Sequence, residues 1–152
     1  MKTLLVPLDF SETTDTVIQQ AVELAGLLPA KIILLHIVEP VATYVPVGGS
    51  MDVIAAAPPM IDMDAETNSQ AQRLEELSAP LRAKGIEVEP VWLVGMAVDD
   101  IVEQAELRKA DFIVMGSHGH GALYHLFSGS VVNGVLQHTK VPVLVIPAVS
   151  TK

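Results

Sequence analysis

The sequence predicts an α/β protein in which one five-stranded parallel sheet is covered by helices on both faces. Two observations support this class. Short, almost unbroken apolar runs alternate with longer segments whose apolar residues recur at helical spacing. The 152 residues suffice for one domain, and half of them are apolar. Since strands alternating with helices favour right-handed βαβ units, we expect a single doubly wound, Rossmann-like domain over residues 1–152, with strand order 3-2-1-4-5.

The first βαβ unit is predicted from residues 3–40. The apolar runs TLLVPLD (3–9) and KIILLHIVEP (31–40) are typical of strands buried on both faces. Ser11 is the expected N-cap of the helix between them. Pro7 lies in the strand that we place at the centre of the sheet, where proline cannot donate a hydrogen bond to a neighbouring strand. We therefore expect it at the carboxyl end of the strand, where no neighbouring carbonyl needs that donor. The apolar face of the helix is formed by Val17, Ile18, Ala21, Val22, Ala25 and Leu28.

The second half of the chain repeats the alternation. Pro80 should kink the second helix or end it early, because it removes a hydrogen bond and crowds the carbonyl of Glu76. Gly85 is a suitable C-terminal stop for that helix. The expected helices cover residues 62–84, 98–110 and 130–138, and the expected strands cover 86–95, 111–116 and 141–147.

Residues 40–60 form an unusually long connection, rich in proline and glycine. Connections of this length inside a domain are uncommon and are often functional or mobile. We expect a mobile loop that acts as a lid over a ligand or binds a partner. A disordered variable insertion is the alternative.

Composition and charge exclude several classes of protein. The chain has no cysteine, so no disulfide framework is possible. No apolar run approaches the ~20 residues of a membrane span, and the apolar stretch before Asp9 is too short for a signal peptide. The net charge is −9, and no basic residue lies between Lys109 and Lys140, which argues against nucleic-acid binding. We expect a cytoplasmic protein with neither membrane nor nucleic acid as partner.

The stretch MGSHGHGALYHLFSGSVV (115–132) is the main functional motif. It runs from the carboxyl end of the fourth strand into the fourth helix. Ligands of open α/β sheets bind outside the carboxyl ends of strands where the order reverses, here between the first and fourth strands. Asp9 and Gly116 should therefore face each other there. Glycines and a helix N-terminus suit an anionic ligand.

Two known glycine patterns do not fit. A P-loop needs Lys and Ser or Thr after its second glycine, whereas Ala122 and Leu123 follow Gly121. A dinucleotide fingerprint starting at Gly119 fails because Tyr124 replaces its last glycine.

The spacing present is G-x-x-G, nine residues, then G-S, from Gly116 to Ser130. Together with LVPLDFSE, ILLHIVEP, DFIVMGSHGHG and GSVVNGVLQHTKVPVLVIP, it resembles the ATP-binding members of the universal stress protein family over almost the whole chain. The resemblance implies adenine near Ile37, ribose near Pro7 to Asp9, and phosphates on 116–122 and 130–132. The implied binding residues are Pro7, Leu8, Asp9, Ile37, Met115, Gly116, Ser117, His118, Gly119, His120, Gly121, Ala122, Gly129, Ser130, Val131 and Val132.

The same resemblance implies ATP, or ADP or AMP, as ligand, with Mg²⁺ or Mn²⁺ carried through the phosphates. It also implies a homodimer joined through the strand at 141–147. We further expect a protein partner, which the sequence does not identify. Family members commonly carry a second hydroxyl two places after the serine. Val132 stands there in this chain, so one phosphate contact is lost.

Several residues have a simpler interpretation as well. Asp9 is alternatively a cap for the following helix. His118, His120 and His125 are alternatively a zinc site, but no cysteine or carboxylate stands near them in the sequence, so we assign no metal ligand. His36, in an apolar strand, is interpreted as a hydrogen-bonded core or crevice residue rather than a ligand.

The motif also argues against efficient catalysis. It has no Lys or Arg to neutralise charge during phosphoryl transfer, and no well-placed general base, so we assign no catalytic residue. The preferred function is a nucleotide-dependent switch or regulatory module of the stress response. The alternatives are a slow ATP hydrolase or phosphotransfer enzyme, and a dimeric interaction module without nucleotide.

Overall fold

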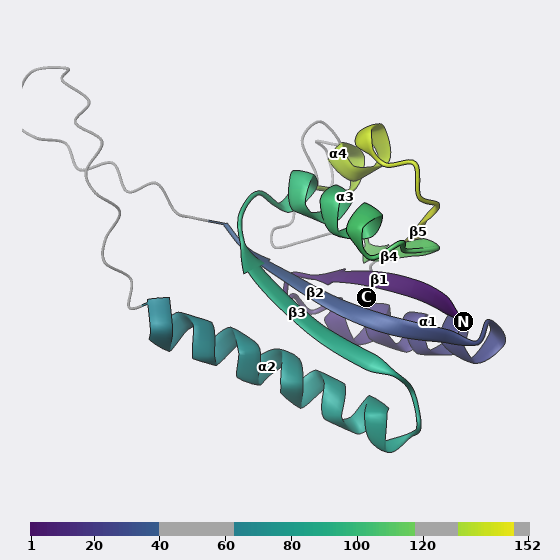
Figure 1. Ribbon diagram of the computed structural model, residues 1–152, viewed down its shortest axis with the longest axis horizontal. Coiled ribbons are helices and arrows are strands. Elements are labelled where there is room, and N and C mark those ends of the chain that lie inside the picture. The colour runs from purple at the N-terminus through teal and green to yellow at the C-terminus, as the bar shows by residue number, and fades with distance from the viewer. Residues whose placement is uncertain (40–62, 118–130, 148–152) are drawn as a thin grey trace, which may run out of the picture.

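The computed structural model describes residues 1–39, 63–117 and 131–147 (Figure 1). The predicted loop 40–60 and most of the glycine motif lie outside this range. In the described part every predicted strand and helix is present, with its ends shifted by a few residues at most. The elements are β1 (Lys2–Leu8), α1 (Thr14–Leu27), β2 (Ala30–Val38), α2 (Met63–Ala83), β3 (Val88–Val94), α3 (Ala97–Leu107), β4 (Phe112–Gly116), α4 (Val131–His138) and β5 (Val143–Ile146).

The strands form one parallel sheet in the order β3-β2-β1-β4-β5, as predicted. Helices α1 and α2 cover one face, and α3 and α4 cover the other (Figure 1). The strand side chains alternate between two apolar clusters. Leu4 and Val6 of β1 belong to the cluster under α1 and α2, whereas Leu5 belongs to the cluster under α3 and α4. Burial on both faces explains why these strands are almost continuously apolar.

Pro7 lies near the carboxyl end of the central strand, as expected. The N–H of Lys2 bonds to Pro29, which precedes β2, and the N–H of Thr3 bonds to Asp111, which precedes β4. Since backbone groups alternate along a parallel strand, the nitrogen of Pro7 is turned toward β4. Pro7 has no N–H to donate, and the pairing of β1 with β4 ends earlier, at Leu5 opposite Ile113.

The start of α1 differs from the prediction. Thr13 rather than Ser11 is the N-cap, and its side chain makes no capping hydrogen bond. Thr13 has φ −85° and ψ −9°, which is helical, whereas a capping side chain needs extended backbone. Ser11 instead accepts a backbone bond from Thr14 at 3.1 Å and contacts the Thr13 hydroxyl at 2.9 Å.

Of the two effects expected of Pro80, early termination does not occur. Helix α2 continues to Ala83, and Gly85, with φ 82°, ends it as predicted. Arg82 bonds both carboxylate oxygens of Glu75 at 2.5 and 3.0 Å, and this pair spans the proline from one side to the other. The hydrogen bond from Arg82 lowers the pKa of Glu75 from its ordinary value.

Asp111 ties the amino ends of β1 and β4 together. Its carboxylate accepts bonds from the Lys2 ammonium at 2.7 Å and from the Thr3 N–H at 2.8 Å. The bond from Lys2, followed by that from Thr3, lowers the pKa of Asp111 below its ordinary value. The carboxylate is therefore stabilised in its charged form in the folded state.

Asp111→Asn should lower stability at neutral pH, and the loss should shrink in acid. Because the folded pKa is depressed, the contribution of Asp111 is complete above about pH 5, where the unfolded side chain is also ionised, and disappears as the pH falls through the folded pKa. Urea unfolding of both proteins from neutral pH downward measures this difference. Glu87→Gln, which removes an exposed carboxylate elsewhere on the protein, is the control. A pH-independent difference would contradict the assignment.

Candidate functional site

The carboxyl ends of β2, β1 and β4 meet at one edge of the sheet because the strands are parallel. From β1 the chain winds to β2 on one side, whereas β4 lies on the other side, so the order reverses between β1 and β4. Pro7 and Leu8 end β1, and Met115 and Gly116 end β4. Ile37 is the next-to-last residue of β2. Five predicted binding residues are thus at the same edge.

The structure divides these residues between the two faces of the sheet. The side chains of Ile37, Met115 and Val132 all belong to the apolar cluster under α3 and α4. Leu8 is buried in the opposite cluster, under α1 and α2. Ile37, Met115 and Val132 thus lie together on one face of the sheet. A ligand over that face would contact the backbone of Leu8 but not its side chain.

Asp9 is exposed directly after β1. Its Oδ1 accepts a hydrogen bond from the Ser11 N–H at 3.0 Å. This bond holds the turn that leads into α1 and does not cap the helix, because α1 begins only at Thr14. A carboxylate has about four lone-pair positions, so this one bond leaves capacity to accept others from a ligand.

The described ends of the glycine motif lie on β4 and α4. The N–H of Ser117 bonds to the Ile146 carbonyl at 2.8 Å, so pairing with β5 extends one residue beyond Gly116. Val131, 38% exposed, begins α4, and Val135 anchors that helix in the core. The first N–H groups of a helix have no acceptor inside it, so this end suits an anion. The predicted residues outside the described range are His118, Gly119, His120, Gly121, Ala122, Gly129 and Ser130, together with His125.

His36 is confirmed as a hydrogen-bonded core residue. It is buried, and its Nδ1 lies 2.8 Å from the Leu8 carbonyl, to which it donates when that nitrogen carries the proton. The ring of Phe10 lies 4.2 Å from the His36 ring, and the guanidinium of Arg73 lies 4.2 Å from the centre of the Phe10 ring. This three-residue group was not predicted, because Arg73 comes from a weakly amphipathic helix far away in the sequence.

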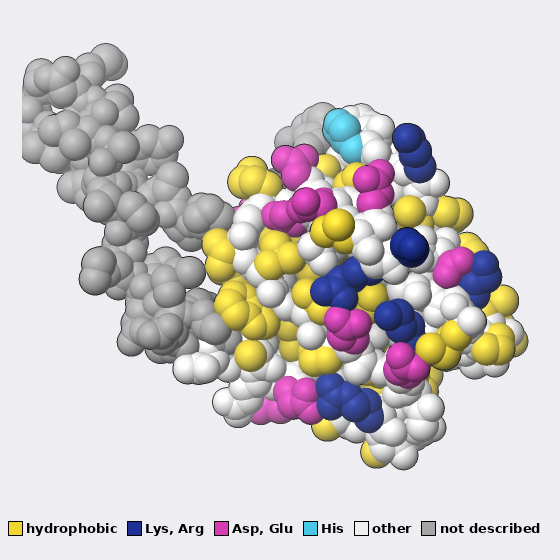
Figure 2. Space-filling view, in the orientation of Figure 1, with side chains coloured by type: hydrophobic (Ala, Val, Ile, Leu, Met, Phe, Trp, Pro, Cys, Tyr) yellow, Lys and Arg dark blue, Asp and Glu magenta, His cyan; other side chains and the backbone are white. Residues whose placement is uncertain are grey.

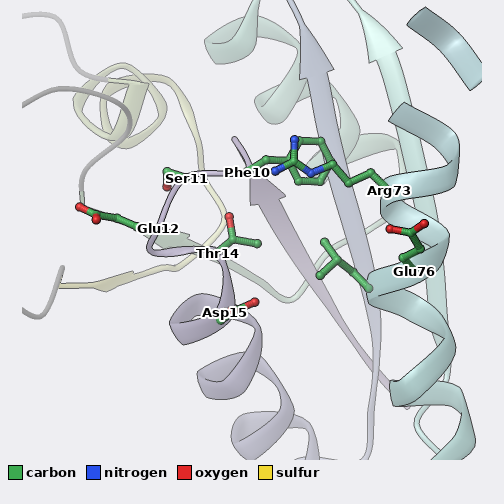
Figure 3. Close-up of a pocket in the computed structure, with 8 residues that line it drawn as sticks. Phe10, Ser11, Glu12, Thr14, Asp15, Arg73 and Glu76 are labelled. Carbon is green, nitrogen blue, oxygen red and sulfur yellow. The ribbon is translucent and has the colours of Figure 1, made fainter. Parts of the chain in front are cut away.

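A pocket of about 300 Å³ opens beside Phe10, between the start of α1 and helix α2 (Figure 3). Its lining mixes hydroxyl, acidic, basic and apolar groups. The Oγ1 of Thr14, on this wall, is buried without a hydrogen-bond partner in the described part of the chain. The lining residues are Phe10, Ser11, Glu12, Thr14, Asp15, Arg73, Glu76 and Leu77.

Glu39 is another residue that sequence reasoning missed. It follows β2, and its Oε1 accepts a bond at 3.0 Å from the N–H of Ala97, the first residue of α3. The N-cap position of α3 is Met96, whose side chain makes no capping bond, so Glu39 supplies the acceptor from outside the helix. A cap contributed by a residue so distant leaves no local signal in the sequence.

Two further findings concern the described residues only. Within residues 1–39, 63–117 and 131–147, no three His, Cys, Asp or Glu side chains are grouped so as to hold a metal ion. None of the helices in these ranges has the length and apolar character to cross a membrane.

Comparison with known proteins places this fold in a family. The model of the universal stress protein family matches residues 1–147. Universal stress protein MJ0577 of Methanocaldococcus jannaschii is 28% identical, over 95% of this chain and 94% of that protein. Its solved structure superposes with a TM-score of 0.77 at 26% identity, covering 99% of this chain and 98% of the other.

Two other solved structures share the fold at 24% identity. A universal stress protein in complex with cAMP has a TM-score of 0.68 and covers 96% of both chains. The universal stress protein from Archaeoglobus fulgidus in complex with dAMP has a TM-score of 0.62, covering 96% of this chain and 98% of that one. Because the family model spans nearly the whole sequence and the sheet order agrees, this chain belongs to the universal stress protein family.

Proposed function

We propose that this protein binds an adenine nucleotide at the carboxyl edge between β1 and β4 and acts as a nucleotide-dependent switch or regulatory module. The observation that carries the proposal is the early end of the β1–β4 pairing at Leu5 and Ile113, at the point where the strand order reverses. Helix α4 is the next element of the chain after β4, so the segment that leaves this edge leads to the N-terminus of that helix. Two proteins of the same fold have been solved with cAMP and dAMP.

The described residues fit such a ligand by their chemistry. Ile37 and Met115 offer apolar contact for a planar base on the face under α3 and α4. Asp9 retains capacity to accept bonds from ribose hydroxyls. Residues 116–122 and 130–132 would receive the phosphates through backbone N–H groups and the positive end of α4. A divalent ion, Mg²⁺ or Mn²⁺, would be held through the phosphates rather than by side chains.

Val132 weakens the phosphate contacts that we propose. Its side chain packs in the apolar cluster under α3 and α4 and has no hydroxyl to donate. One charge-assisted hydrogen bond contributes about 1–2 kcal/mol, so this position lowers affinity without removing the site.

A regulatory role is favoured over catalysis because the phosphate segment supplies no basic side chain. On the face of the protein shown in Figure 2, Lys and Arg side chains are interspersed with Asp and Glu and form no large basic patch. We infer that nucleotide binding changes the conformation or assembly of the protein, which an unknown protein partner would then read.

Mass spectrometry of the ligand released from freshly purified, denatured protein identifies the nucleotide. Calorimetric titration of the stripped protein with ATP, ADP and AMP then ranks their affinities, with and without Mg²⁺ or Mn²⁺. We expect ATP to bind most tightly. Failure of all three to bind would overturn the proposal, and rapid multiple-turnover phosphate release would contradict the regulatory role.

We infer in addition a homodimer joined through β5, the outer strand at one end of the sheet. An outer strand with apolar side chains favours pairing with a second chain. Leu144 of β5 is 40% exposed and Leu136 of α4 is 49% exposed. Val143 is half-buried against the cluster under α3 and α4, so a change there would also disturb the core.

Leu144→Lys should therefore shift the protein from dimer toward monomer while the fold survives. A buried lysine in a symmetric interface would be repeated in both subunits and desolvated. Sedimentation equilibrium measures the change. Val94→Lys, at the 43% exposed end of the opposite outer strand, is the matched control and should leave the dimer intact. A parent protein that is monomeric at micromolar concentration would rule out the dimer.

A further inference from the structure

We propose that Phe10 is a positioning residue for the nucleotide site, held by His36 and Arg73 so that the turn after β1 presents Asp9 correctly. This inference rests on the proposed function, because it concerns how the same site is organised. It assigns a role to a residue that would not touch the nucleotide and whose side chain packs toward the other face of the sheet.

The backbone of Phe10 is in an unfavourable conformation. Its φ is +56°, in the left-handed region that bulky residues rarely adopt. A residue other than glycine keeps a positive φ only when its surroundings hold it there. Contacts made by the Phe10 side chain must therefore offset the cost of this backbone conformation.

Two elements outside the turn hold the Phe10 ring. The His36 ring of β2 lies 4.2 Å away at an interplanar angle of 41°. The Arg73 guanidinium of α2 lies 4.2 Å from the ring centre, at cation–π distance (Figure 3). His36 is itself fixed by its bond of 2.8 Å to the Leu8 carbonyl, two residues before Phe10. The ring is thus anchored to both the sheet and α2.

The anchored ring determines the position of Asp9. Phe10 connects Asp9 to Ser11, and the Asp9 carboxylate bonds back to the Ser11 N–H at 3.0 Å. The Ser11 carbonyl then accepts the Thr14 N–H at 3.1 Å, where α1 begins. Rotation about φ of Phe10 would break this sequence of bonds and redirect the carboxylate. Phe10 therefore acts on the ligand through Asp9.

Comparison of Phe10→Ala with Phe10→Gly separates positioning from simple packing. Both variants lose the ring. Only in the alanine variant does a positive φ at residue 10 remain energetically unfavourable, because glycine adopts positive φ readily. We expect ATP affinity in the order parent, Phe10→Gly, Phe10→Ala, with alanine about five- to tenfold weaker than glycine. If the ring only filled space, glycine would be as damaging as alanine or worse, and that order would overturn the proposal.

Arg73→Gln tests the second contact while leaving Phe10 in place. It should weaken ATP binding about two- to fivefold, as expected for one cation–π contact. Lys84→Gln, just beyond the end of α2, removes one positive charge away from Phe10 and should leave affinity unchanged. Equal effects of Arg73→Gln and Lys84→Gln would assign the change to net charge and overturn the role of Arg73. Circular dichroism confirms that each variant is folded.

Amide hydrogen exchange in the nucleotide-free protein tests the turn independently of ligand binding. The Ser11 and Thr14 amides should exchange faster in Phe10→Gly than in the parent, and fastest in Phe10→Ala. If the parent binds no adenine nucleotide, the proposed function fails and exchange alone decides whether the turn is held in this way. Unchanged exchange at both amides in Phe10→Ala would overturn the inference.

Discussion

Gly119→Val should remove nearly all adenine-nucleotide binding, a loss of at least about a hundredfold, while the protein stays folded. Backbone N–H groups can cradle a phosphate only where the chain approaches it closely, which glycine permits. A branched β-carbon would block that approach or forbid the required φ. Gly119 lies in the sequence between the end of β4 and the start of α4, and the substitution changes none of the side chains that form the two apolar clusters, so stability should change little.

Ser130→Ala provides the comparison for Gly119→Val. It removes one hydroxyl contact and should cost on the order of 1 kcal/mol, or about fivefold in affinity. Calorimetric titration with ATP measures both variants, and circular dichroism checks their folding. If folded Gly119→Val binds ATP as the parent does, the segment between β4 and α4 is only a connector and our assignment of the phosphates to it is wrong.

The fold could be predicted from sequence because its strongest determinants are local. Leu4 and Leu5 enter different apolar clusters, and the same alternation in the neighbouring strands produces the unbroken apolar runs. Pro7 was informative as well, since a proline in a central strand is tolerated only where no partner needs its N–H. The strand order was predicted correctly, and the position that we propose for the site was inferred from that order without knowledge of any side-chain contact.

Other features depend on contacts that no local pattern specifies. Ser11 looked like an N-cap by residue type, but the cap position depends on backbone angles, and these place it at Thr13. The bond from Ala97 to Glu39 joins elements separated by the whole of α2 and β3. The contact between Phe10 and Arg73 likewise requires α2 to lie beside the start of α1. Such contacts follow from packing and appear only in three dimensions.

Gly134 should be the glycine of the described helices least tolerant of a side chain. A β-carbon at this position of α4 would lie 2.6 Å from Cγ2 and 3.0 Å from Cγ1 of Val98 on α3. Val98 is β-branched, so it cannot turn aside without leaving its preferred rotamer. The absence of a side chain at Gly134 therefore sets how closely α3 and α4 pack, and with it the position of the α4 N-terminus.

Two opposing effects decide the outcome of substitution at Gly134. Glycine to alanine within a helix gains about 0.5–1 kcal/mol, whereas forcing atoms into a packed contact costs about 1–3 kcal/mol. Gly134→Ala should therefore range from neutral to about 2.5 kcal/mol destabilising. Gly134→Leu, which adds three more carbons at the same contact, should cost about 3 kcal/mol, near the upper end of overpacking effects. Because α4 would shift, Gly134→Leu should also weaken nucleotide binding.

Gly26→Ala is the matched control, because Gly26 is exposed in α1 and a β-carbon there would have no atom within 4 Å. That variant should gain up to about 1 kcal/mol from helix propensity alone. Urea unfolding of the three variants and the parent gives the comparison, with calorimetric titration for the effect on ATP. If Gly134→Ala stabilises the protein as much as Gly26→Ala does, then α3 and α4 do not pack against each other as closely as the distances to Val98 require.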